Sequence, residues 1–158
     1  MEKQEETNYS GAIYGTIVSM AVIATSAKDP SLGPVLIAFW AAITAFIFWL
    51  AHVYSDIVAE GYARPREAGK IARRALRREW PLVQGAMIPS IAMLLTVVTP
   101  MSTDSASWVA MGAGVVVLFG TGLLIGARDE MGWSRRIVIG SINACFGLLI
   151  VALKVWVH

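Results

Sequence analysis

The stretch GPVLIAFWAAITAFIFWLAHVYSD, residues 33–56, decides the fold class. It carries no Asp, Glu, Lys or Arg before Asp56. A helix needs about 20 mostly apolar residues to cross a hydrocarbon core about 30 Å thick. We therefore predict that this stretch is a membrane-spanning helix.

The rest of the chain has the same character. Of its 158 residues 56% are apolar and 15% charged, whereas a soluble domain is about 45–50% apolar and about 25% charged. The composition predicts an all-α, polytopic integral membrane protein with residues 1–158 in one membrane domain. The five predicted spans are residues 10–27, 33–56, 81–98, 107–127 and 136–157, of which the first and third barely reach spanning length.

Basic residues predict the orientation. They cluster between the second and third spans and again between the fourth and fifth, whereas the opposite connections hold only Lys28. Loops rich in Lys and Arg stay in the cytoplasm. We expect a multi-pass inner-membrane protein with a cytoplasmic amino terminus and an extracytoplasmic carboxyl terminus. The acidic start, MEKQEETNYS, lacks the positive charge of a signal peptide, so we expect the first helix to be retained.

The second span carries the strongest candidate site, formed by His52, Asp56 and Glu60. Their spacing of four places them on one helical face. Toward the amino-terminal end of the span, the same face carries small residues, which mark close helix contacts in lipid. Bulky residues fill the opposite face: Leu36, Phe39, Ile43, Ile47, Leu50, Tyr54 and Ile57. The three polar groups are therefore expected to point toward protein or water.

The depth of this site and its chemistry leave alternatives open. At about 1.5 Å per residue from Pro34, His52 lies roughly 27 Å along the helix and Asp56 roughly 33 Å, near the cytoplasmic surface. Histidine is the side chain that changes charge near neutral pH, so His52 and Asp56 could relay protons or attract a cation. The alternative is a His52–Asp56 hydrogen bond that pins the helix to a neighbour. No second histidine or cysteine lies near enough to favour a metal, and we predict no metal or cofactor.

Other polar residues fall in the cytoplasmic halves of the first, third and fifth spans. Tyr14, Gln84 and Asn143 either line the same pathway or hydrogen-bond one helix to another. Pro89 lies midway along the third span, where it deprives the Gly85 carbonyl of its helical partner and is a candidate hinge.

The segment RPREAGKIARRALRREW, residues 64–80, predicts a cytoplasmic amphipathic helix over 65–80. Apolar residues recur on one face and basic residues occupy most of the rest, which is typical of an interfacial helix that contacts anionic lipid headgroups or docks a partner. The alternative is that its arginines only set the orientation. The residues expected to make this contact are Arg66, Lys70, Arg73, Arg74, Arg77 and Arg78. Nucleic acid is not an expected partner.

Two GxxxG pairs, Gly11/Gly15 and Gly122/Gly126, permit close helix contacts within one chain or between copies. The usual catalytic motifs are absent from the sequence, so we do not expect an enzyme. The predicted function is an ion or proton channel, or a small transporter, that works as a homo-oligomer. The alternative is a non-catalytic accessory or scaffold subunit of a larger membrane complex.

Overall fold

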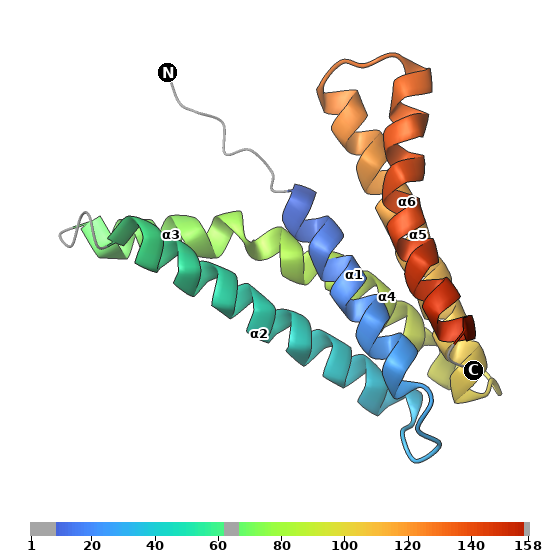
Figure 1. The fold of residues 1–158 in the computed structure, drawn as a ribbon. Helices are drawn as coiled ribbons and strands as arrows, with labels where there is room; N and C mark the ends of the chain where they lie inside the picture. The colour runs from blue at the N-terminus through green and yellow to red at the C-terminus, as the bar shows by residue number, and fades with distance from the viewer. Residues whose placement is uncertain (1–8, 62–66, 157–158) are drawn as a thin grey trace.

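The computed structural model describes residues 9–61 and 67–156, and this part of the chain is helical with short connections (Figure 1). The elements are α1 (Tyr9–Ser26), α2 (Pro34–Gly61), α3 (Ala68–Arg78), α4 (Trp80–Leu95), the 3-10 turn η2 (Thr96–Val98), α5 (Thr103–Arg128) and α6 (Trp133–Trp156). Five stretches are long and apolar enough to cross a membrane, one of them running through α3, α4 and η2. The prediction of an all-α chain with five such helices is confirmed.

The helices reach further into polar sequence than hydropathy predicts. α2 continues to Gly61 rather than ending at Asp56. α5 begins at Thr103, so Asp104 belongs to its first turn and not to the preceding loop. The Ser102 hydroxyl accepts a hydrogen bond from the Ser105 N–H at 3.1 Å and caps this helix.

α1 is the central helix of the bundle and contacts α2, α4, α5 and α6. It crosses α4 with the two backbones in direct contact. A methyl group at Gly15 would overlap the Leu82 carbonyl, and one at Gly85 would overlap the Ala12 carbonyl. One glycine from each helix therefore makes this crossing possible.

Pro89 lies inside α4 and is buried. Because proline has no N–H, the carbonyl of Gly85 loses its usual helical partner. The Thr16 hydroxyl of α1 is shared between that carbonyl, at 3.1 Å, and the Ala12 carbonyl of its own helix, at 2.8 Å. Thr16 thus gives the carbonyl that the proline frees a partner in these apolar surroundings. The Ser19 and Ser90 hydroxyls lie 3.2 Å apart and make a second polar contact between α1 and α4.

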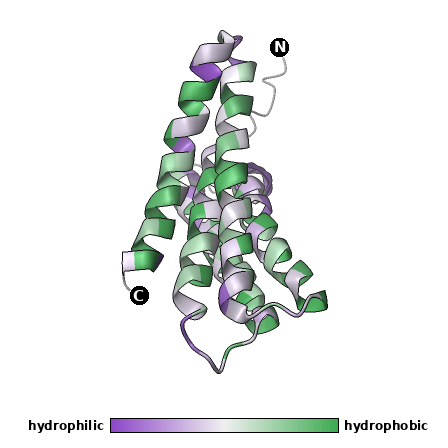
Figure 2. Ribbon diagram, turned by 90° about the vertical axis from the view of Figure 1, so that its right-hand side faces the viewer, coloured by the Kyte–Doolittle hydropathy of each residue, from purple (hydrophilic) through white to green (hydrophobic). Residues whose placement is uncertain are grey.

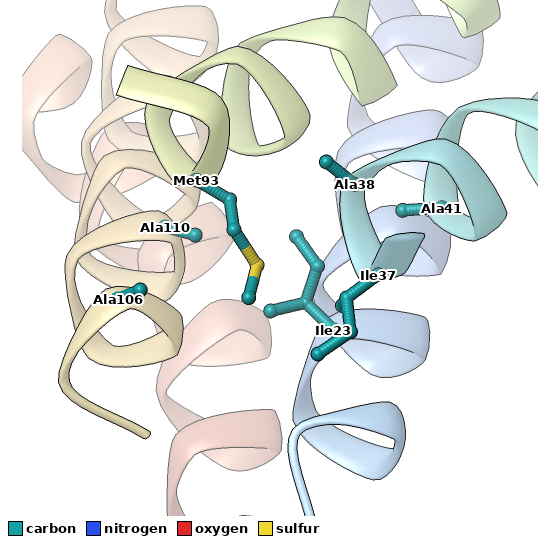
Figure 3. Close-up of a cluster of buried hydrophobic side chains, with 7 residues drawn as sticks. All are labelled: Ile23, Ile37, Ala38, Ala41, Met93, Ala106 and Ala110. Carbon is teal, nitrogen blue, oxygen red and sulfur yellow. The ribbon is translucent and has the colours of Figure 1, made fainter. Parts of the chain in front are cut away.

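The interior between the helices is packed with small and flexible apolar side chains. Figure 3 shows one cluster, in which Met93 of α4 and Ile23 of α1 lie between the alanines of α5 and α2. As predicted, the small residues of α2 are buried, at Ala38, Ala41 and Ala45. The predicted bulky face is exposed at Phe39, Ile47 and Tyr54, among others. Ile43 and Ile57 are exceptions, because both are half-buried, and Ile57 packs against the cluster that α2 forms with α3 and α4.

α5 and α6 form an antiparallel hairpin at one side of the bundle (Figure 1). A methyl group at Gly122 would overlap the backbone of Gly140, so this GxxxG pair serves a contact within the chain. Beyond α5, α6 also contacts α1. Figure 2 shows hydrophilic residues at the α5–α6 turn and apolar residues along most of the helices below it. Much of α6 is an exposed apolar surface.

The basic amphipathic helix is α3, which packs beside the last turns of α2 (Figure 1). Ile71 and Ala75 are buried on one face, as the sequence predicts. The helix stops at Glu79, and Pro81 lies in the first turn of α4, where proline is tolerated. The Trp49 indole N–H donates to the Leu76 carbonyl at 3.4 Å and joins α3 to α2.

Candidate functional site

The carboxylates of the predicted site face a cation from α3. The Arg78 guanidinium donates to the Asp56 carboxylate at 2.5 Å and to Glu79 at 3.1 Å, and it lies 4.0 Å from Glu60. Helix α2 supplies two of these carboxylates, four residues apart on one face, and the break between α3 and α4 supplies the third. The cluster is half open, since the Arg78 side chain is 44% exposed and that of Asp56 23%. Three carboxylates around one guanidinium give this cluster a net negative charge, although the exposed basic residues of α3 lie beside it.

His52 lies one turn away from this cluster and has other neighbours. Its Nδ1 lies 2.8 Å from the Phe48 carbonyl, so the ring is bonded to its own helix rather than to Asp56. The Tyr14 ring of α1 lies 5.5 Å from the His52 ring and 5.8 Å from the Phe48 ring, centroid to centroid. His52 is exposed. The structure therefore brings His52 and Tyr14 together and pairs Asp56 with Arg78 instead.

The remaining predicted pathway residues lie elsewhere. Gln84 is exposed on the face of α4 opposite its buried residues. Asn143 lies on α6 between Gly140 and Gly147, two glycines that contact α5. The amide nitrogen of its side chain is buried and has no hydrogen-bond partner. Pro89 is buried inside α4, and its role as a hinge stays a prediction.

The basic residues of α3 divide into two groups. Arg78 is engaged by carboxylates, whereas Lys70, Arg73, Arg74 and Arg77 are exposed along the outer face of the helix. Arg66 lies outside the described residues. Over residues 9–61 and 67–156, no three His, Cys, Asp or Glu side chains gather as a metal site.

Sequence reasoning missed a second charged cluster, at the opposite end of the bundle. Lys154 of α6 is buried, and its ammonium donates to the Asp104 carboxylate at 2.8 Å and to the Ser107 hydroxyl. The same ammonium lies 4.5 Å from the centre of the Trp108 ring, which is a cation–π contact. The Trp108 N–H donates to the other Asp104 oxygen at 3.1 Å.

A signal for this second cluster was present in the sequence. Ser107 and Lys154 are equally far from the α5–α6 turn, so two antiparallel helices must place them opposite each other. The predicted start of the fourth span at residue 107 left Asp104 in a loop and concealed the pairing.

No protein-family model matches the chain, and no curated protein or solved structure is significantly similar to it. The two charged clusters and the exposed His52–Tyr14 pair are therefore the observations from which a function can be argued.

Proposed function

We propose that the chain is the subunit of a homo-oligomeric channel or small transporter for protons or small cations in the inner membrane. The observation that carries the proposal is the exposed His52 imidazole beside Tyr14. Ionisable groups on membrane-spanning helices are costly against lipid and usually face protein or water. A neighbouring copy that covers this surface would give His52 such an environment.

The interior of one copy supports a pathway between copies rather than through one. The backbones of α1 and α4 touch at Gly15 and Gly85, and those of α5 and α6 touch at Gly122. Buried methionine, isoleucine and leucine side chains fill the remaining space. The buried hydroxyls are hydrogen-bonded within or between these helices, at Thr16, Ser19, Ser90 and Thr121.

In this proposal the residues near His52 have distinct roles. His52 is the group that takes up and releases the proton, and Tyr14 holds one face of its ring. Asp56 and Glu60, with Arg78 between them, form the charged cytoplasmic mouth. Their net negative charge would raise the local concentration of cations.

Proton flux into liposomes that contain the purified protein tests the proposal. A dye inside the liposomes reports pH, and a potassium gradient with a potassium ionophore supplies the voltage. We expect flux above that of empty liposomes, and His52→Ala should abolish it. Ser55→Ala, at an exposed position of the same helix, is the matched control and should leave flux unchanged. Absence of flux from folded protein, or unchanged flux in His52→Ala, would overturn the proposal.

A second candidate is an accessory subunit of a larger membrane complex. The long exposed apolar face of α6, which packs only along one side, favours it. Extraction in mild detergent distinguishes the two. A self-associated species without other proteins supports the channel, and a stoichiometric larger partner supports the accessory subunit.

A further inference from the structure

A shallow groove opens where α2, α3 and α4 meet. It is lined by Trp49, Leu76, Arg77 and Trp80 and has a volume of about 370 Å³, within the range of about 300–1,000 Å³ that is usual for ligand sites. The rings of Trp49 and Trp80 meet edge to face, with centroids 5.5 Å apart. Three of the four lining side chains are therefore apolar or aromatic, and the fourth is a cation.

The two neighbouring arginines at this junction have different surroundings. Arg78 turns toward the carboxylates of Asp56, Glu60 and Glu79. Arg77 instead lines the groove. One turn before it, Arg73 and Arg74 are exposed on the same helix. The groove therefore lies in a positively charged part of the surface, beside a cluster that has already neutralised its own arginine.

We propose that this groove binds one anionic glycerophospholipid, with an acyl chain against Leu76 and Trp80 and the headgroup phosphate at Arg77. Guanidinium groups bind phosphate through two parallel hydrogen bonds. Tryptophan is enriched where headgroups meet acyl chains. The site does not depend on whether the protein conducts ions.

Charge and shape favour a lipid over a protein segment as the occupant. The groove is shallow and apolar, and the exposed Arg73, Arg74 and Arg77 place positive charge beside it. Apolar surface next to positive charge matches a molecule that has an apolar tail and an anionic head. On the predicted orientation the cation also lies on the cytoplasmic side, where anionic lipids attract basic segments by about 1 kcal/mol per residue.

Native mass spectrometry of the delipidated full chain tests the site. The probes are palmitoyl-oleoyl phosphatidylglycerol, its phosphatidylcholine counterpart and soluble glycerol 3-phosphate. We expect phosphatidylglycerol to bind about fivefold more tightly than phosphatidylcholine, as one basic residue near a lipid headgroup predicts. Arg77→Gln should remove that preference, whereas Arg135→Gln, an exposed arginine on the same predicted side, should keep it.

The other outcomes are equally informative. Equal losses in Arg77→Gln and Arg135→Gln would mean diffuse attraction to the whole basic surface and would overturn the site. Binding of glycerol 3-phosphate as tight as that of the whole lipid would overturn the acyl contact. Trp80→Ser must weaken the binding of both phospholipids, because both have the acyl chain that Trp80 contacts. A wild-type protein without any preference would refute the proposal.

Discussion

The two ends of the bundle hold a charge in opposite ways. At one end the Lys154 side chain is 1% exposed and is surrounded by Asp104, Ser107 and Trp108. At the other end Arg78 is 44% exposed and shared among three carboxylates. One end has a single buried cation with a dedicated partner, and the other has an open network with an excess of negative charge.

The difference shows which end is held firmly. A buried ammonium loses its hydration and depends on its partners, so the removal of one partner is expensive. An open pair gains little, because water solvates its members when they separate. The Lys154 end is therefore expected to resist opening, while the Arg78 end can rearrange at low cost.

Asp104→Asn should have the largest effect on stability. It leaves Lys154 buried without its counter-charge. Because the Asp104 side chain is itself 55% exposed, we expect a loss of about 3 kcal/mol, at the lower end of the cost of breaking a fully buried pair. The free energy of unfolding in detergent micelles measures the loss. Asp129→Asn, an exposed position just beyond the other end of α5, is the matched control and should cost little.

A double variant shows whether that loss arises from the unpaired charge. Asp104→Asn with Lys154→Met removes both ions and keeps most of the buried volume. We expect its stability to lie within about 1 kcal/mol of the wild type. A double variant as unstable as Asp104→Asn alone would show that the carboxylate acts in another way.

Gly15→Ala tests whether the packing between the two ends matters as much as the charges. The added methyl group would overlap the Leu82 carbonyl and force α1 away from α4. We expect a loss of about 1–3 kcal/mol in the same unfolding assay. Gly112→Ala has open space around it, so it should be neutral or stabilise α5 by up to about 1 kcal/mol. Equal effects of the two substitutions would contradict the close crossing.

Asp56→Asn should lower the stability less than Asp104→Asn or Gly15→Ala. Arg78 keeps Glu79 and lies near Glu60, and the pair is open to solvent. We expect a loss of at most about 1 kcal/mol in the free energy of unfolding. A loss as large as that of Asp104→Asn would mean that both ends hold their charge in the same way.

The sequence predicts the helices well and their charged partners poorly. Hydropathy locates the five apolar stretches, because burial in lipid or protein requires long apolar runs wherever the chain crosses. Hydropathy does not show where a helix ends within polar sequence. For that reason the predicted span began at residue 107 and left Asp104 outside the helix. The Asp56–Arg78 pair depends on the break at Glu79 and on how α3 folds back against α2. Neither feature has a period that a sequence pattern could reveal.

The buried lysine also bears on how the chain is made. On the predicted orientation α6 must carry the Lys154 ammonium across the hydrocarbon to reach the outer side, which opposes the insertion of that helix by itself. Its partner Asp104 lies fifty residues earlier, on the helix that is synthesised just before. If α5 and α6 enter the bilayer as a hairpin, the two charges cross as a neutral pair. In that case the order of the helices along the chain sets the route by which a charged residue reaches its place in an apolar protein.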